Sequence, residues 1–208
     1  ELDGPRGRIY LIKQVLEGHP VSEKTRLHLD RCLTCRSCES TCASGVQYGR
    51  LVDIGRRVVD QRLPRSGGQA LVRKVLQEAV PHPGLCGAAV KVGRLLRPLL
   101  PSGLADKIPH GAAGKARPWP DVRALPRRML ALAGCVQPSL APNINAATAR
   151  VLARLGIALV EPAGAGCCGA VRHHLNDETG ALAAARRNID AWWPVIEAGA
   201  EAVVVTAS

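Results

Sequence analysis

Four cysteines within eleven residues constrain this chain more than any other feature of its sequence. They are Cys32, Cys35, Cys38 and Cys42, and they follow the pattern C-x2-C-x2-C-x3-C. That pattern is the ligand spacing of bacterial-type ferredoxin sites. Two-residue gaps let successive thiolates converge on one centre, and an iron–sulfur cluster requires soft anionic sulfur ligands. The run therefore predicts a [4Fe–4S] site that these four cysteines ligate, in a protein that transfers electrons.

Other interpretations of the cysteine run remain open from spacing alone. Zinc also binds thiolates, but its structural sites usually come as two separated C-x2-4-C or H-x3-5-H pairs. Disulfides or plain thiols are further alternatives, although cysteines so close together would close no long loop. A zinc-stabilised basic module that binds nucleic acid is therefore kept as an alternative function.

The cysteine run also bears on the extent of the chain. In two-cluster ferredoxin modules the fourth cysteine of each run ligates the other cluster. Cys42 would then need a second C-x2-C-x2-C-x3-C run, and the sequence contains none. Ala43 stands where a proline usually follows. Because the chain also begins at Glu1 rather than Met, we expect a fragment that carries only the second ferredoxin motif.

The net charge of +11 raises nucleic acid as a partner. Single-strand binding uses aromatic stacking platforms, however, and the chain has three Trp, two Tyr and no Phe. The charge instead predicts contact with an acidic partner or with the anionic face of a membrane, and no nucleic acid partner. Eight cysteines, several at metal-ligand spacings, indicate a reducing compartment. We therefore expect a cytoplasmic protein, peripheral at the inner face of the membrane.

Apolar periodicity predicts helices throughout residues 1–100, which we expect to form a helical ferredoxin-like iron–sulfur domain. Residues 101–126 are rich in Gly, Pro and Ala and are predicted to be a linker. The predicted helices cover 9–16, a short stretch capped by Ser22, 48–63, 69–80 and 88–100.

Residues 127–208 show a different pattern, in which short apolar runs alternate with helices. Strands are predicted at 129–133, 157–160 and 202–206, with helices from a cap at Asn143 or Asn145 to Leu155 and over 177–198. This alternation predicts a small parallel α/β domain, truncated at its end, with ligands at the carboxyl ends of its strands. Cys135 and the Cys167–Cys168 pair fall on such loops. The fold class is thus α followed by α/β.

Several stretches together resemble the glycolate oxidase iron–sulfur subunit family, whose wider relatives include heterodisulfide reductase-type and lactate-utilisation proteins. They are E-L-D-G-P-R-G-R-I-Y-L-I-K at Glu1, C-R-S-C-E-S-T-C-A-S-G-V-Q-Y-G-R-L at Cys35, A-G-C-V-Q at Ala133, G-C-C-G-A at Gly166 and A-R-R-N-I-D-A-W-W at Ala185. The resemblance covers essentially the whole chain. It is the combination of motifs, rather than the cysteine run alone, that makes it specific.

The resemblance implies a cysteine-rich "CCG" domain over 127–208, in which Cys135, Cys167 and Cys168 form a second centre with a cysteine further along the family's sequence. It implies that FAD resides on a partner subunit of a glycolate dehydrogenase and that the clusters relay electrons from it toward a quinone-type acceptor. A lactate or glycerol-3-phosphate dehydrogenase complex is the near alternative. No paired carboxylates, Ser–His–Asp set or Walker loop is present in the sequence, so no catalytic residue is expected.

Side chains and amides near the cysteines are expected to tune the cluster potential. The predicted donors to sulfur are the amides of Thr34, Arg36, Ser37 and Glu39, and the charges of Arg31 and Arg36 are expected to raise the potential. Other residues have structural interpretations. We expect Cys86 to be a small buried hydrophobe, His173 and His174 to lie at a helix start or in the core, Trp192 and Trp193 to anchor the last helix on the sheet, and the pairs Arg56–Arg57, Arg127–Arg128 and Arg186–Arg187 to lie on solvated faces.

Overall fold

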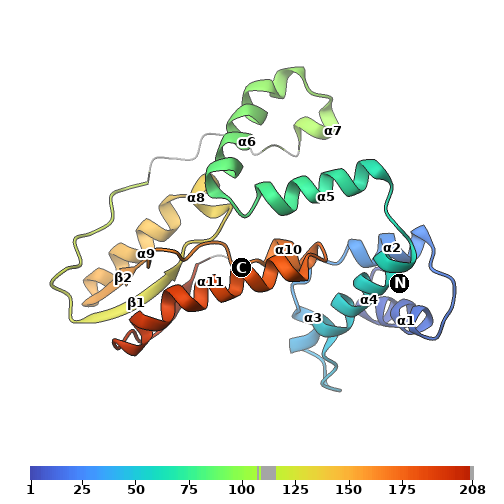
Figure 1. Cartoon of the computed structure of the whole chain (residues 1–208), viewed down its shortest axis with the longest axis horizontal. Helices are drawn as coiled ribbons and strands as arrows, with labels where there is room; N and C mark the ends of the chain where they lie inside the picture. The colour runs from blue at the N-terminus through green and yellow to red at the C-terminus, as the bar shows by residue number, and fades with distance from the viewer. Residues whose placement is uncertain (107, 109–115, 207–208) are drawn as a thin grey trace. The chain divides into compact units, whose positions relative to one another are not determined.

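The computed structural model describes residues 1–106, 108 and 116–206 of the chain (Figure 1). The chain divides into two compact units, Glu1–Val72 and Arg73–Ser208. Each unit has its own cluster of buried apolar side chains. The division lies before the predicted boundary at residue 100, because the helix that follows Pro83 packs with the second unit.

The first unit is helical, and the start of its second helix has the predicted capping residue. Ser22 Oγ accepts a hydrogen bond from the Thr25 amide at 3.1 Å, which confirms its predicted role as an N-cap. Gly18 follows the first helix with φ at 94°, a left-handed conformation that glycine adopts without strain. The helices are α1 (Pro5–Leu16), α2 (Glu23–Asp30), α3 (Ser37–Ser40) and α4 (Tyr48–Arg62).

The core of the first unit lies where α1 and α2 pack against α4. Gly55 permits the close approach of α1, because a Cβ at this position would lie 2.6 Å from Ile12 Cγ1. Any larger residue would push the helices apart. The buried apolar side chains are Ile12, Val15, Leu29, Tyr48, Val52 and Val59.

Helices also occupy the stretch between the cysteine run and the sheet. The helix predicted at 88–100 begins earlier, at Pro83, where proline suits the first helical position. Part of the predicted linker is the short helix α7, while residues 107 and 109–115 lie outside the described residues. No helix in the described part of the chain is both long and apolar enough to span a bilayer. The elements are α5 (Gly67–Ala79), α6 (Pro83–Leu96), the 3-10 helix η1 (Arg97–Leu99) and α7 (Ser102–Ala105).

The second unit contains a small parallel sheet with strand order β2-β1-β3. Met129 pairs with Leu159 and Ala131 with Val204, so both neighbours run parallel to the central strand. The predicted strands are thereby found, and the fold is confirmed as α followed by a small parallel α/β layer. Their bounds are β1 (Arg127–Leu132), β2 (Ile157–Val160) and β3 (Val203–Val205).

Apolar strand residues and small helical residues form the core of this unit. Leu159 and Ala131 pack against Ala149 of α9, and α9 lies against β2. The long last helix is capped by Asp177, whose Oδ1 accepts from the Gly180 amide at 3.0 Å. The helices are α8 (Gln137–Leu140), α9 (Asn143–Arg154), α10 (Ala170–His174) and α11 (Glu178–Glu197).

Candidate metal centres

The loop between α2 and α4 carries the four cysteines of the predicted cluster site. Cys32 follows α2, Cys38 lies within α3, and Cys42 comes just after it. All four are free thiols, and Cys35 is exposed while the other three are partly buried. One short stretch of the first unit therefore presents all four sulfurs.

The backbone on both sides of Cys35 is left-handed. Thr34 and Arg36 have φ values of 56° and 57°, a conformation that costs a non-glycine residue on the order of 1–3 kcal/mol. The turns direct amides toward sulfur. The Thr34 amide donates to Cys32 Sγ at 3.4 Å, and hydrogen bonding from the Ser37 amide, then from its hydroxyl, lowers the pKa of the Cys35 thiol. The predicted roles of Thr34 and Ser37 as sulfur donors are confirmed.

Two of the predicted tuning groups have other partners. The Glu39 amide donates to the Arg36 carbonyl at 2.8 Å, so the prediction that it faces a sulfur is wrong. The Glu39 carboxylate accepts from the Gly49 amide at 2.7 Å. Arg31 Nη1 donates to Asp3 Oδ2 at 3.1 Å, and this carboxylate offsets part of the positive charge of Arg31 beside the loop.

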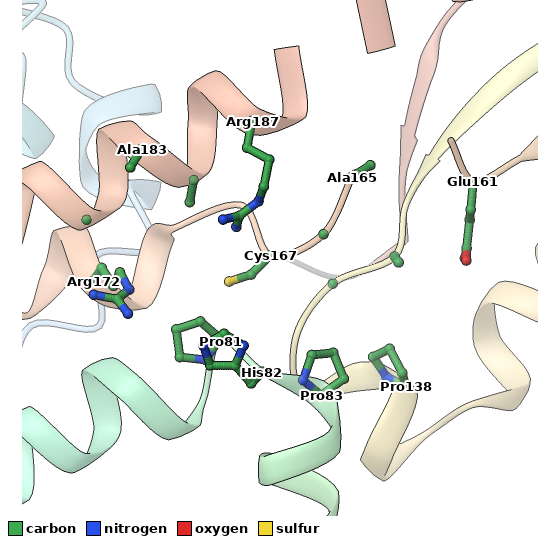
Figure 2. Close-up of a pocket in the computed structure, with 15 residues that line it drawn as sticks. Pro81, His82, Pro83, Pro138, Glu161, Ala165, Cys167, Arg172, Ala183 and Arg187 are labelled. Carbon is green, nitrogen blue, oxygen red and sulfur yellow. The ribbon is translucent and has the colours of Figure 1, made fainter. Parts of the chain in front are cut away.

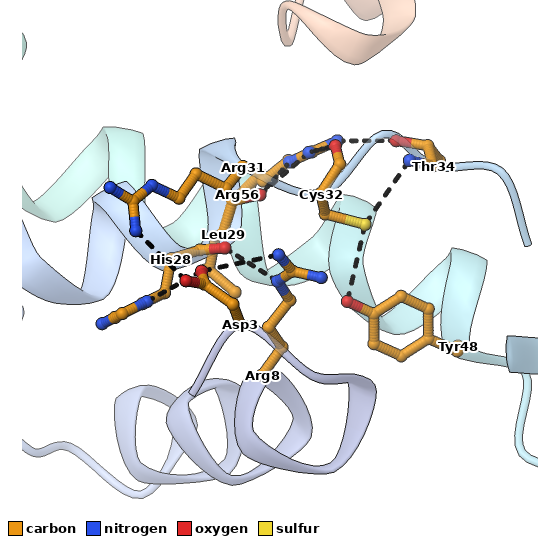
Figure 3. A network of polar contacts seen from close by, with 9 residues as sticks. All are labelled: Asp3, Arg8, His28, Leu29, Arg31, Cys32, Thr34, Tyr48 and Arg56. Carbon is orange, nitrogen blue, oxygen red and sulfur yellow. Dashed lines mark hydrogen bonds and ion pairs between the residues drawn. The ribbon is translucent and has the colours of Figure 1, made fainter. Parts of the chain in front are cut away.

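Arg56 holds the start of the cysteine loop from α4 (Figure 3). Its guanidinium is buried, with 6% of the residue exposed. It donates to the Leu29 carbonyl at 2.9 Å and to the Cys32 carbonyl at 2.6 Å. It also donates to Thr34 Oγ1 at 3.0 Å. The prediction of a solvated face is therefore wrong for Arg56, because its buried guanidinium donates to backbone carbonyls at the end of α2 and just after it.

Tyr48 supplies a further donor to the same sulfur. Its hydroxyl donates to Cys32 Sγ at 3.6 Å, and the side chain is buried (Figure 3). Burial, followed by the hydrogen bond with Cys32, raises the pKa of the Tyr48 phenol, so the hydroxyl keeps its proton. This role of Tyr48 is not evident from the sequence, although the residue stands in the V-Q-Y-G-R-L motif.

The chemistry of these donors fits an iron–sulfur cluster. The loop provides four soft thiols together with amide and hydroxyl donors that stabilise negative charge on sulfur. Within residues 1–106, 108 and 116–206, no three Cys, His, Asp or Glu side chains already stand close enough to ligate a single ion. In a cubane each iron takes its own thiolate, so the four ligands are spread around the cluster.

The second set of cysteines lies at the carboxyl end of the sheet. Cys135 follows β1, and Cys167 and Cys168 lie on the loop between β2 and α10. Because β1 and β2 are parallel neighbours, these loops meet at one edge. Hydrogen bonding with Cys167 lowers the pKa of Cys135 to about 7 and raises that of Cys167. Hydrogen bonding with Cys167 also raises the pKa of Cys168, so Cys167 lies within hydrogen-bonding reach of both other thiols.

Asn188 of α11 fixes the loop that carries the cysteine pair. Its Nδ2 donates to the Cys167 carbonyl at 3.1 Å, and its Oδ1 accepts from the Gly166 amide at 2.8 Å. The side chain is buried, so these are its own polar partners in the core. The Gly169 amide donates to Cys167 Sγ at 3.5 Å. This role of Asn188 is not evident from the sequence.

A second amide, Asn145, fixes the loop that carries Cys135. Its Nδ2 donates to the Ala133 carbonyl at 3.1 Å, and its Oδ1 accepts from Gln137 Nε2 at 2.7 Å and from the Thr206 hydroxyl at 2.6 Å. The prediction that Asn143 or Asn145 caps α9 is wrong, because Pro142 occupies the cap position. Asn145 lies inside the helix, buried and directed at the loop.

Residues 129–208 match the family model described as "Cysteine-rich domain" (CCG). This stretch is therefore similar to the CCG family. The match begins within β1 and includes the sheet and all three thiols of the second set.

Comparison with curated proteins confirms the resemblance found in the motifs. The chain is 58% identical over all 208 residues to the glycolate oxidase iron–sulfur subunit of Escherichia coli (strain K12), of which it covers 51%. It is 31% identical over 217 positions to the probable glycolate oxidase iron–sulfur subunit of Bacillus subtilis (strain 168), covering 92% of this chain and 49% of that protein. The chain thus spans about half the length of these relatives. No solved structure matches it significantly.

A cavity of about 660 Å³ opens beside Cys167 (Figure 2). Figure 2 shows Cys167 and Arg187 extending into it from a loop and from α11. His82, at the start of α6, and Glu161, after β2, also line it, and burial raises the pKa of the Glu161 carboxyl. The domain therefore has space next to the Cys167 thiol for a bound group.

The remaining predicted residues have mixed outcomes. Cys86 is buried in α6, as predicted for a small hydrophobe. His173 and His174 end α10, so their predicted place at a helix start is wrong. Trp193 is 55% exposed and does not anchor α11, whereas Trp192 is half-buried. The pairs Arg127–Arg128 and Arg186–Arg187 are exposed, as predicted.

Proposed function

We propose that this chain is the electron-transfer part of a flavin-dependent glycolate dehydrogenase. The observation that carries the proposal is the Cys32–Cys42 loop, where four free thiols lie next to amide and hydroxyl donors directed at sulfur. Relatives named as glycolate oxidase iron–sulfur subunits suggest glycolate as the substrate of the complex. In this proposal FAD and the chemistry on glycolate belong to a partner subunit, and electrons leave toward a quinone-type acceptor.

The cysteine loop would bind a [4Fe–4S] cluster through its four thiolates. Such a cluster, when bound, accepts and releases one electron at a time. The amides of Thr34 and Ser37 and the Tyr48 hydroxyl donate hydrogen bonds to sulfur, which stabilise the more negative reduced state and raise the potential. Arg56 keeps these donors in place by binding the Cys32 carbonyl and the Thr34 side chain.

We propose a second iron–sulfur centre in the CCG domain. Its ligands on this chain would be Cys135, Cys167 and Cys168, whose thiols interact with one another. The adjoining cavity of about 660 Å³ gives this centre room. The side chains of Asn188 and Asn145 hold the two loops by donating hydrogen bonds to loop carbonyls. With two centres in one chain, an electron would pass through two clusters in succession.

Metal analysis tests the proposal directly. Anaerobically purified or reconstituted protein should contain iron and acid-labile sulfide, and dithionite reduction should produce an EPR signal of a reduced cubane. The variant Cys35→Ser should lose at least half of its iron and sulfide, because one ligand of the loop is removed. Cys86→Ala, which alters a buried cysteine outside both sets, should retain them. Zinc without sulfide, or no metal uptake at all, would contradict the assignment.

We also propose that α6 and η1 contact the cytoplasmic face of the inner membrane. Exposed apolar side chains recur at helical spacing along them (i, i+7, i+10, i+11 and i+14), at Leu85, Val92, Leu95, Leu96 and Leu99. Leu95 and Leu99 are 78% and 82% exposed. No Asp or Glu occurs between Glu78 and Asp106, whereas Lys91, Arg94 and Arg97 do. An apolar helical stripe in a segment that carries only positive charge suits an anionic bilayer surface.

Vesicle binding measures this membrane contact. The double variant Leu95→Glu/Leu99→Glu should bind phosphatidylglycerol-containing vesicles about tenfold or more weakly than the parent protein, since burying one leucine contributes about 1.5–3 kcal/mol. Leu155→Glu, at an exposed leucine after α9, is the control and should bind like the parent. Equal sedimentation of all three proteins with vesicles would rule out α6 as the contact surface.

A further inference from the structure

The second unit has a basic cavity that the electron-transfer proposal does not use. It encloses about 510 Å³ between α9 and the segment that precedes β1. It shares no lining residue with the cavity beside Cys167. Its described walls are three arginines and small apolar residues, with no acidic residue among them: Arg117, Pro120, Ala147, Arg150, Val151, Ala153 and Arg154.

The fold brings these three arginines to one place. Arg150 and Arg154 are one turn apart on α9 and therefore share a face of the helix. The Arg117 amide donates to Asn143 Oδ1 at 3.1 Å, which ties the segment before β1 to the start of the same helix. Like charges at this spacing repel each other, so the arrangement works against stability unless a negative group joins it.

Arg150 gives independent evidence that a partner is missing. Its Nη1 is buried, and it has no hydrogen-bond partner among the described residues. A guanidinium is always charged, and a buried donor without an acceptor is costly. Such a group in a native structure calls for an explanation, often an ion or ligand. Turning the guanidinium into the cavity to meet an anion would satisfy it.

We propose that this cavity binds a small oxyanion, a phosphate or carboxylate group of a soluble ligand. The planar forks of arginine pair with both groups through two parallel hydrogen bonds. Arg150 and Arg154 would make these bonds from α9, and Arg117 would close the site from the segment before β1. The apolar lining, Pro120 and Val151 among it, leaves room for the carbon skeleton of the ligand.

Calorimetric titration at constant ionic strength tests the site, with inorganic phosphate in one arm and malonate in the other. The full chain should bind at least one of the two, and the arm that binds identifies the group. The variants Arg150→Lys and Arg154→Gln should each weaken binding at least tenfold. Arg117→Gln, at an exposed side chain, should weaken it without changing the fold seen by circular dichroism.

The control is Arg186→Gln, which removes one exposed positive charge from α11, outside the cavity. It should bind the anion as the parent does. Equal weakening in Arg186→Gln and in the cavity variants would show general charge attraction and overturn the proposal. Binding of neither phosphate nor malonate by the parent protein would overturn it as well.

Discussion

Replacing Arg56 with methionine should lower the free energy of unfolding of the first unit by about 3–5 kcal/mol. The side chain is buried and donates to the carbonyls of Leu29 and Cys32 and to the hydroxyl of Thr34. Methionine fills a similar volume but donates nothing, so all these hydrogen bonds are lost, and the Leu29 carbonyl keeps only the Cys32 amide as a donor. The cost falls on the residues that shape the cysteine loop.

Hydrogen exchange followed by mass spectrometry is the suitable measurement, because it resolves the two units separately. Amides of α2 and α4 should exchange faster in Arg56→Met, while those of α11 should keep the parent rate. Arg57→Met changes the exposed neighbour on the same helix and should cost less than about 1 kcal/mol. Equal exchange in the two variants would mean that Arg56 does not support the loop. The Arg56→Met variant should also lose cluster iron faster than the parent protein on exposure to air.

Arg56 illustrates what the sequence could not reveal in the first unit. Helical periodicity predicted α4 to within a residue, and the structure places Val52 and Val59 of this helix in the core. It could not distinguish Arg56 from Arg57, because the acceptors of Arg56 lie 22 to 27 residues earlier in the chain. A long side chain that crosses to a distant loop leaves no periodic pattern. The local apolar pattern therefore predicted the helices, whereas the burial of the Arg56 side chain depends on carbonyls that are distant in the sequence.

The short helices were missed for a different reason. The helices α3, α8 and α10 have four or five residues, too few to show an apolar period. By contrast β2 was predicted at its observed bounds, since its apolar run lies directly between Gly156 and a polar loop. The prediction of the α9 N-cap was wrong because asparagine is a residue type that often caps helices, but the Asn145 side chain hydrogen-bonds the Cys135 loop instead.

The prediction that Cys135 lies near the Cys167–Cys168 pair came from the sheet topology rather than from the spacing of the cysteines in the sequence. Parallel strands carry their loops to one edge, so Cys135 and Cys167 were expected to approach across 32 residues. The groups that hold the loops, Asn188 and Asn145, were not foreseen. An amide within a helix gives no sign of which backbone it will bind until the helix is docked. The supporting residues of both cysteine sites thus needed the structure.

Gly169, the glycine of the C-C-G motif, should not tolerate even a methyl group. Its φ is 85°, a left-handed conformation that costs alanine about 1–2 kcal/mol. A Cβ there would also lie 2.8 Å from the Ala181 carbonyl oxygen and 3.1 Å from Ala184 Cβ. Because one of these contacts is with helix backbone, the neighbouring atoms cannot rotate away, and overpacking adds about 1–3 kcal/mol to the cost of the substitution. Gly169→Ala should therefore destabilise the second unit by about 2–5 kcal/mol.

Gly166→Ala is the matched control, because it adds the same methyl group three residues away. No atom lies within 4 Å of a Cβ at Gly166, and its amide still donates to Asn188. Urea denaturation with hydrogen exchange of α11 should therefore show a large change for Gly169→Ala and less than about 0.5 kcal/mol for Gly166→Ala. Similar values for both would mean that α11 moves to accept the methyl group. A selective effect would show that α11 packs closely on the glycine of the C-C-G motif.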